Sequence, residues 1–312
     1  MTTGLISHPE CLDHLPPGGH PESPARLRAV LTALERESFQ DLVRIDAPRV
    51  AKSDLLRAHD AEFVDLMMGP VAAAAAERCV QLDPDTAMSA GSLNAALRAA
   101  GSVIAAVEEV HAGRLRNAFC AVRPPGHHAE RARAMGFCLF NNVAIGALHA
   151  REVCGYGRIA IVDFDVHHGN GTQDIFWSDR DTLYVSSHQS PFYPGTGSAA
   201  ERGVADNVLN VPLRAGSGSR EFRAAYEREV FPALLQFAPD FIFISAGFDA
   251  NRDDPLAELD LVENDFSWVT KAVCEIAQAG CGARVVSVLE GGYDLQALAR
   301  SAAAHVRALM EA

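Results

Sequence analysis

Apolar residues recur every three to four positions along several stretches of this 312-residue chain. This spacing predicts amphipathic helices, and several of the stretches begin with Ser, Asp or Asn, the residues that best cap a helix N-terminus. The predicted helices are Ser23–Glu37, Ser53–Met68, Ser89–His111, Asn141–Glu152, Ser219–Phe237, Glu263–Ala279 and Asp294–Leu309.

Between these helices lie short apolar runs with almost no polar alternation, which is typical of strands covered on both faces. The predicted strands are Ala118–Val122, Arg158–Val162, Thr182–Ser186, Val208–Leu213, Phe241–Ser245 and Arg284–Leu289. Strand and helix alternate, and no repeat or low-complexity linker divides the chain. We therefore expect an α/β fold in which residues 1–312 form a single three-layer domain, with a mainly parallel sheet flanked by helices.

The amino-acid composition of the chain limits the classes of function that it is expected to have. The chain is 48% hydrophobic and carries a net charge of −13, and Lys52 and Lys271 are the only lysines among its 27 basic residues. This balance argues against a nucleic-acid partner and favours a basic peptide or a polyamine. The start of the chain lacks the pattern of a secretory signal, and the alanine tract at 72–76 is too short to span a membrane.

The seven cysteines are an odd number, are widely scattered and include no C-x-x-C pair. We expect them to be reduced thiols in a cytoplasmic protein. The sequence gives no indication of an oligomeric state.

Polar clusters follow four of the predicted strands. They lie at 123–128 (RPPGHH), 163–171 (DFDVHHGNG), 246–249 (AGFD) and 290–293 (EGGY). The carboxyl ends of parallel strands share one edge of a sheet, where ligands bind. Residues more than a hundred positions apart can therefore meet in one pocket.

Two of these clusters supply candidate metal ligands. Asp165 and His167 are two residues apart, so in extended geometry their side chains point the same way, and Asp249 can add a third ligand. Two carboxylates and one imidazole with an open position are typical of a catalytic divalent-metal site. Such a donor set accommodates Zn, Fe(II), Co or Mn. For the Asp-x-His tripeptide alone, a capped strand end is an equally good interpretation.

A two-metal site of the arginase type needs further carboxylates two residues beyond the histidine and two beyond the later aspartate. Those positions hold Gly169 and Asn251. Glycine offers no side-chain ligand and asparagine is a poor substitute for a charged one, so the sequence predicts one catalytic metal.

Three further residues suit the hydrolysis of an amide. His127 and His128 can act as acid and base near neutral pH, and the Tyr293 hydroxyl can donate to a carbonyl oxygen as it becomes negative. Asp163 beside one imidazole would raise its pKa, whereas the neutral Asn170 beside the other would only orient it. A structural histidine pair and an ordinary buried tyrosine are the alternatives for these residues considered singly.

Five segments together resemble the histone deacetylase family: RPPGHH at 123–128, GFCLFNN at 136–142, DFDVHHGNGTQ at 163–173, SAGFDA at 245–250 and LEGGY at 289–293. They occur in the family's order, and HPESPARL at 20–27 resembles an N-terminal family segment. The resemblance implies an arginase/deacetylase-like fold and zinc-dependent removal of acetyl groups from the ε-amine of lysine.

The resemblance also implies a role for each matched residue. By it Asp165, His167 and Asp249 are zinc ligands, His128 is the main proton shuttle, His127 is its electrostatic partner held by Asp163, and Tyr293 polarises the carbonyl. It further implies a structural potassium ion with oxygen ligands from Asp163, Asp165, His167, Ser186 and Ser187. Asn170 stands where class I members carry aspartate, and with LEGGY it is similar to class II and bacterial histone deacetylase-like amidohydrolases.

Substrate preference is less defined. Gly136, Phe137 and Tyr193 are candidates to line a narrow tunnel, Tyr193 standing where phenylalanine is common, and Asp85 is a candidate to grip the substrate backbone. Leu256 is apolar where polyamine-specific relatives often carry an acidic residue, which favours acetyl-lysine in a peptide or protein. The alternatives are a small acetylated amine such as an acetylpolyamine, another acyl amide, and a catalytically silent acyl-lysine binding module.

Overall fold

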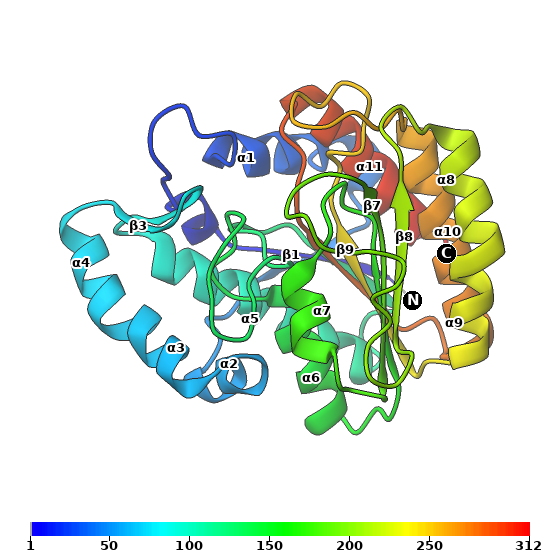
Figure 1. Cartoon of the computed structure of the whole chain (residues 1–312), viewed down its shortest axis with the longest axis horizontal. Coiled ribbons are helices and arrows are strands. Elements are labelled where there is room, and N and C mark those ends of the chain that lie inside the picture. The colour runs from blue at the N-terminus through cyan, green and yellow to red at the C-terminus, as the bar shows by residue number, and fades with distance from the viewer. Residues whose placement is uncertain (1) are drawn as a thin grey trace.

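The structure is a computed structural model that describes residues 2–312, and its centre is a parallel sheet (Figure 1). Within these residues the sheet has eight strands in the spatial order β2-β1-β5-β10-β9-β6-β7-β8, and every adjacent pair is parallel. The strands are β1 (Thr3–Ser7), β2 (Val43–Asp46), β5 (Asn117–Cys120), β6 (Ile159–Asp163), β7 (Thr182–Gln189), β8 (Val208–Leu213), β9 (Phe241–Ala246) and β10 (Val285–Leu289).

Helices cover both faces of the sheet. One layer contains α1 (Pro24–Ala33), α11 (Leu295–Glu311), α10 (Glu263–Gly280), and α8 (Ser219–Ala225) continued through η4 (Tyr226–Val230) into α9 (Phe231–Phe237). The other contains α5 (Ser92–His111), α6 (Asn142–Glu152), α7 (Asn170–Phe176) and α2 (Lys52–Ala58). The expected α/β fold, with a mainly parallel sheet flanked by helices, is confirmed.

The remaining elements form an extension at the side of the sheet (Figure 1). They are α3 (Ala61–Leu66), η3 (Met67–Val71), α4 (Ala72–Glu77) and an antiparallel hairpin of β3 (Val80–Asp83) and β4 (Thr86–Met88). Two short 3-10 helices, η1 (Pro9–Leu12) and η2 (Glu37–Phe39), flank α1. None of the helices described in residues 2–312 has the length and apolar character required to cross a membrane.

Burial explains why these runs become strands. β5, β6, β7, β9 and β10 are buried at every position, as the lack of alternation predicts for strands with helices on both faces. Strands β1, β2, β3 and β4 were not predicted. Of these, β2 is an edge strand of four mostly exposed residues with the sequence VRID. The predicted helix 53–68 is divided at His59, whose backbone is extended (φ −122°, ψ 149°).

Candidate active site

The four polar clusters follow strands that are neighbours in the sheet. β5, β10, β9 and β6 lie side by side, so the segments that follow them meet at one edge. This places His127 and His128 after β5, Asp165 and His167 after β6, and Asp249 and Tyr293 after β9 and β10. The structure thus brings together residues that are up to 166 positions apart in the chain.

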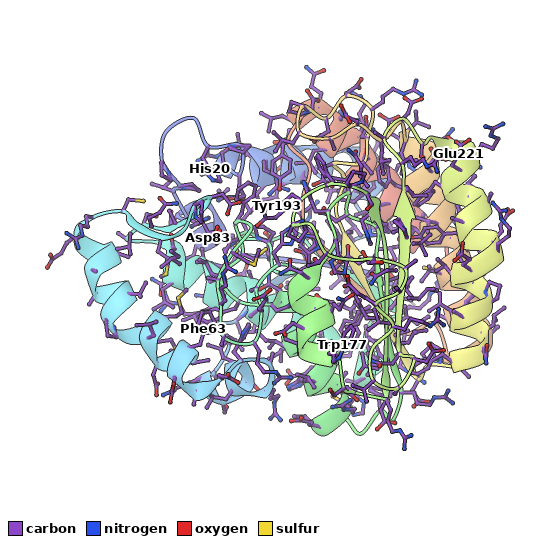
Figure 2. The ribbon with its side chains drawn as sticks, viewed as in Figure 1. His20, Phe63, Asp83, Trp177, Tyr193 and Glu221 are labelled. Carbon is purple, nitrogen blue, oxygen red and sulfur yellow. The ribbon has the colours of Figure 1, made fainter. Side chains whose placement is uncertain are left out.

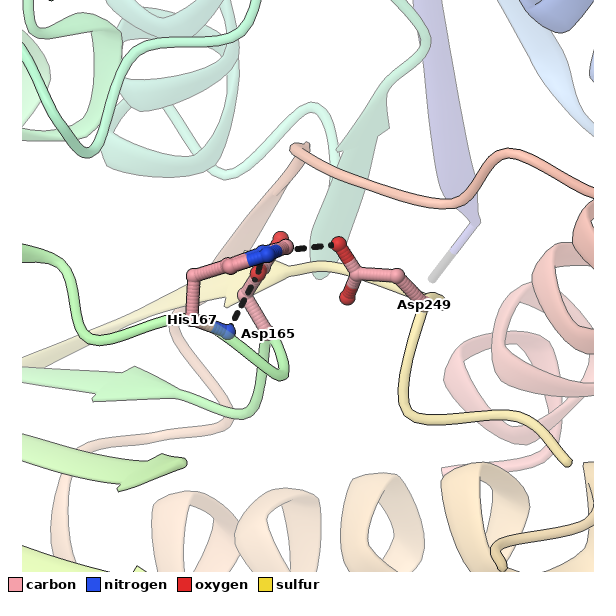
Figure 3. Close-up of side chains that lie close together, drawn as sticks. All are labelled: Asp165, His167 and Asp249. Carbon is pink, nitrogen blue, oxygen red and sulfur yellow. Dashed lines mark hydrogen bonds and ion pairs between the residues drawn. The ribbon is translucent and has the colours of Figure 1, made fainter. Parts of the chain in front are cut away.

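Asp165, His167 and Asp249 form a buried triad of candidate metal ligands (Figure 3). Each offers a ligand atom within 4.8 Å of the other two. His167 Nδ1 lies 3.1 Å from Asp165 Oδ1 and 3.2 Å from Asp249 Oδ2. All three residues are buried, and the two carboxylates are fully excluded from solvent. Two buried negative groups beside one imidazole need a positive charge among them.

The hydrogen bonds within the triad fit a bound cation. Asp249 Oδ2 is buried and has no hydrogen-bond partner, although its second oxygen accepts from the Val166 backbone N–H at 2.9 Å. Burial and the neighbouring Asp165 raise the pKa of Asp249. A buried carboxylate oxygen without a hydrogen bond, which has the His167 ring nitrogen close by and faces a second carboxylate, is costly unless a cation lies between them. The residues present therefore fit a divalent metal.

Two hydrogen bonds give the adjacent histidines different environments. His127 Nδ1 donates to Asp163 Oδ2 at 3.0 Å, and the Tyr184 hydroxyl donates to the same oxygen at 3.0 Å. His128 Nδ1 lies 2.8 Å from Asn170 Oδ1, so a charged partner supports one imidazole and a neutral partner the other. The two ring centroids are 4.0 Å apart.

Charge and burial separate the pKa values of the pair. Burial opposes a charge on His127, but Asp163 and Asp165 outweigh it and raise the pKa of His127 to about 10. Burial, together with the charges of His127 and His167, holds the pKa of His128 well below its ordinary value. His127 is therefore a cation and His128 a neutral imidazole, as acid–base catalysis by a pair requires.

Glycines allow the close packing around these groups. A Cβ on Gly291 would lie 2.0 Å from Asp249 Oδ2 and 2.6 Å from Asp165 Oδ2. A Cβ on Gly136, whose φ of +56° also favours glycine, would lie 2.4 Å from the His128 ring. Side chains at either position would occupy the space of the site itself.

A narrow cavity of about 80 Å³ leads to these groups. Its lining residues are Asp85, His128, Gly136, Phe137, His167, Tyr193, Leu256 and Tyr293. Every residue predicted from the sequence to contact substrate is therefore at this cavity. Tyr193, labelled in Figure 2, is 37% exposed, and burial, Asp85 and Asp83 raise the pKa of its hydroxyl.

Comparison with known proteins identifies the family of this chain. The model of the histone deacetylase domain matches residues 20–309. The chain belongs to the histone deacetylase family. Its relatives include hydrolases named as deacetylases and deacetylase-like amidohydrolases.

A histone deacetylase-like amidohydrolase from Pseudomonas aeruginosa is 39% identical over 88% of this chain and 73% of its own length. A type-2 histone deacetylase from Dictyostelium discoideum is 38% identical over 99% of this chain, which spans only 21% of that protein. Among solved structures, the HD domain of HDA15 is 37% identical and superposes with a TM-score of 0.93, covering 99% of this chain and 88% of the other.

Sequence reasoning did not assign roles to several buried groups that hold the histone deacetylase site together. Glu290 Oε2 accepts from the backbone N–H groups of Gly126 and His127 at 2.7 and 3.2 Å. Asp254 Oδ2 accepts from the Tyr293 backbone N–H at 2.6 Å. The available signal for Glu290 was a charged residue directly after a continuous apolar strand.

The sequence also indicated no role for Arg26. Its guanidinium lies over the Tyr293 ring, 4.9 Å from the centroid, and donates to the backbone carbonyl oxygens of Gly292 and Glu290 at 2.5 Å each. It is fully buried and paired with Glu22. These contacts join the first helix to the loop that carries Tyr293.

Gly169 and Asn251 occupy the two positions where a second metal would need carboxylate ligands. A Cβ on Gly169 would lie 2.4 Å from Asp163 Oδ2, so no ligand side chain fits there. Asn251 donates through Nδ2 to Ser301 Oγ at 3.1 Å, away from the triad. Ser186 pairs in register with Asp163 in the sheet, and Ser187 Oγ lies 2.9 Å from the Tyr226 hydroxyl.

Proposed function

We propose that this chain is a zinc-dependent deacetylase that hydrolyses the acetyl amide of N-acetyl-lysine in peptides or proteins to acetate and a free amine. One observation carries the proposal: His128, His167 of the buried triad and Tyr293 all line the same narrow cavity. Because the family model extends over residues 20–309, we further propose that residues 1–312 act as one catalytic domain. A cytoplasmic location belongs to the proposal, since all seven cysteines are free thiols.

Asp165, His167 and Asp249 would hold the single zinc ion. When bound, zinc polarises a carbonyl oxygen and makes a water molecule acidic enough to attack it. The same two oxygens and one nitrogen would also accept Fe²⁺ or Co²⁺. A structural potassium ion is proposed beside Asp163, Asp165, His167, Ser186 and Ser187. Oxygen atoms of Asp163 and of its sheet neighbour Ser186 are of the hard type that such an ion prefers.

The chain's own groups move the protons and stabilise the developing charge. The neutral His128 takes a proton from the attacking water and passes it to the departing amine. His127, kept cationic by Asp163, favours negative charge forming beside it. Burial and nearby carboxylates raise the pKa of Tyr293, so its hydroxyl keeps its proton and donates to the carbonyl oxygen as it becomes negative.

The cavity favours a slender substrate. Phe137 and Tyr193 flank a space that fits an unbranched alkyl chain ending in an acetyl amide, and the exposed Leu256 adds an apolar contact at its end. Asp85 lies at the same cavity and can accept a backbone N–H of a peptide. A small acetylated amine is a second candidate, because the Asp83 and Asp85 carboxylates beside Tyr193 also suit an ammonium group.

The test is acetate release from an acetyl-lysine peptide and from N-acetylputrescine by zinc-loaded protein, chelated protein, and the variants Tyr293→Phe and His128→Ala. Tyr156→Phe is the matched control, because Tyr156 contacts His111 and Phe241, away from the candidate site. We expect Tyr293→Phe to lower kcat by about 100-fold or more, as loss of one oxyanion donor does.

Turnover that the chelator abolishes, that both site variants lose and that Tyr156→Phe retains would support the proposal. The faster substrate identifies the substrate class. If protein shown to contain zinc releases acetate from neither substrate, the proposed deacetylase function is overturned and a binding module is favoured.

A further inference from the structure

The Asn170 side chain connects the catalytic pair to a residue outside the cavity. Its Oδ1 lies 2.8 Å from His128 Nδ1, while its Nδ2 donates to Glu130 Oε1 at 2.8 Å. Nδ2 also lies 3.3 Å from Met135 Sδ, a weak acceptor. Every polar atom of this buried amide therefore has a partner, and Glu130 is its only charged one among the described residues.

The direction of the Asn170 amide decides which nitrogen of His128 carries the proton. With Oδ1 toward the ring, His128 Nδ1 must donate, so Nε2 has a free lone pair and can accept a proton from water. With the amide turned over, Nδ2 would donate to Nδ1, and the neutral ring would carry its proton on Nε2. That tautomer cannot act as the base.

Glu130 favours one of these two directions. A carboxylate accepts from the Asn170 N–H group, whereas a turned amide would place Oδ1 against Glu130 Oε1, oxygen against oxygen. Met135 Sδ distinguishes the two directions only weakly, because a thioether is a poor acceptor. The preference therefore depends mainly on Glu130.

Two contacts hold the backbone of Glu130 in place, one at its N–H group and one at its carbonyl oxygen. Its N–H donates to Arg133 O at 2.9 Å, and its carbonyl oxygen lies 3.0 Å from His59 Nδ1. Helix α7, which begins at Asn170, packs against the same segment: a Cβ on Gly171 would lie 2.2 Å from Ala129 O. The backbone segments that carry the Glu130 carboxylate and the Asn170 amide are thus packed against each other.

Glu130 and Asn170 border a separate cavity of about 280 Å³, together with Gln173, Asp174, Trp177, Thr196 and Glu201. None of these residues lines the cavity that contains His128 and Tyr293. Substitutions at Glu130 can therefore alter His128 without changing the walls of the substrate cavity.

We propose that Glu130 is a positioning residue that fixes the Asn170 amide and, through it, the Nδ1-protonated tautomer of His128. The kinetic consequence rests on the proposed deacetylase function. The tautomer itself does not, because it can be measured without turnover.

The first experiment is ¹⁵N NMR of the zinc-loaded chain labelled at histidine, with the His128 signals assigned by their loss in His128→Ala. In the unsubstituted chain we expect a proton on Nδ1 and none on Nε2. Glu130→Ala should give a mixture of both tautomers. Glu130→Gln should restore most of the original state, because its amide oxygen can accept the same N–H. Asp174→Asn is the control: it removes a negative charge from the same outer cavity, while its remaining amide oxygen can still accept from the Arg131 backbone N–H that Asp174 Oδ2 binds at 3.0 Å.

The second experiment measures kcat and KM in the same variants. We expect Glu130→Ala to lower kcat by roughly tenfold, part of the 10²- to 10⁴-fold that a general base supplies, and to leave KM unchanged. In an Asn170→Asp background, two carboxylates face each other. There we expect removal of the Glu130 charge, as in Glu130→Gln, to raise kcat instead of lowering it, because it relieves the repulsion. A purely structural role for Glu130 predicts no such reversal.

The outcomes separate the two proposals. A His128 tautomer that is the same in Glu130→Ala and in the unsubstituted chain overturns the positioning role, whatever the activity. A His128 tautomer that shifts in Glu130→Ala, while the unsubstituted zinc-loaded chain releases no acetate, supports the positioning role and overturns the deacetylase function. Thermal melting identifies any variant that fails to fold. If Glu130→Ala does so, Glu130→Leu takes its place, because leucine fills similar space and offers no acceptor to the Asn170 N–H. The positioning role again predicts a mixture of His128 tautomers, and an unchanged tautomer overturns it.

Discussion

Gly169 lies directly against Asp163, so that a Cβ at Gly169 would come within 2.4 Å of Asp163 Oδ2 and 3.1 Å of His127 Nδ1. Even a methyl group must therefore displace the carboxylate that holds His127. We expect Gly169→Ala to lower kcat by about 100-fold, the effect of a displacement near 1 Å in an active site. Gly69→Ala, where a Cβ meets nothing within 4 Å, is the control. Steady-state acetate release measures both, and an unchanged kcat in Gly169→Ala would contradict the prediction.

Asp254 should matter for Tyr293 although it touches only its backbone. Asp254 accepts from the N–H groups of Tyr293 and Leu256, and removing the carboxylate leaves both unpaired. We expect Asp254→Ala to lower the free energy of unfolding by about 1–3 kcal/mol and to reduce kcat more than it changes KM. Urea unfolding and steady-state kinetics test this. The neighbouring Asp253→Ala loses only an exposed ion pair with Arg300 and should change stability by less than about 1 kcal/mol.

Metal analysis should find one divalent ion per chain. Gly169 offers no ligand, and Asn251 points toward Ser301, so even Asn251→Asp is expected to keep a stoichiometry of one. Asp249→Asn should lose the ion. Because a ligand that binds only the folded state stabilises it, a chelator should lower the melting temperature and added zinc should restore it. Elemental analysis that found two ions per chain would contradict the single-metal interpretation.

Strands β5 to β10 and the edge that carries the site were predictable because burial leaves a local pattern in the sequence. β6, β9 and β10 are continuous apolar runs, and a polar cluster directly follows each one, so their shared edge could be inferred before any contact was known. Edge strand β2 leaves no such pattern, since its four residues are mostly exposed.

The supporting residues could not be predicted because their roles depend on contacts between distant segments. Arg26 donates hydrogen bonds to backbone carbonyl groups that are 264 and 266 positions away in the chain. Glu130 has its effect through the direction of one amide on another element, which neither residue type nor spacing encodes. Local patterns thus point to the candidate reacting groups, while the three-dimensional fold is needed to find the residues that orient them.

Buried neutral histidines should make the fold sensitive to mild acid. Burial lowers the pKa of His305 to about 3, and its two ring nitrogens lie beside the hydroxyl groups of Thr270 and Ser287. An unfolded chain takes up this proton below about pH 6.5, whereas the folded chain does not, so the unfolded state gains stability as the pH falls. The contribution of His305 is therefore fully present above pH 6.5 and decreases by about 1.4 kcal/mol per pH unit as the pH falls toward 3. Urea midpoints measured from pH 7.5 to 5 should fall less steeply in His305→Gln than in the unsubstituted chain, while His111→Gln, at an exposed site, should match the unsubstituted slope. Equal slopes in the chain with and without His305 would show that its burial does not govern the acid response.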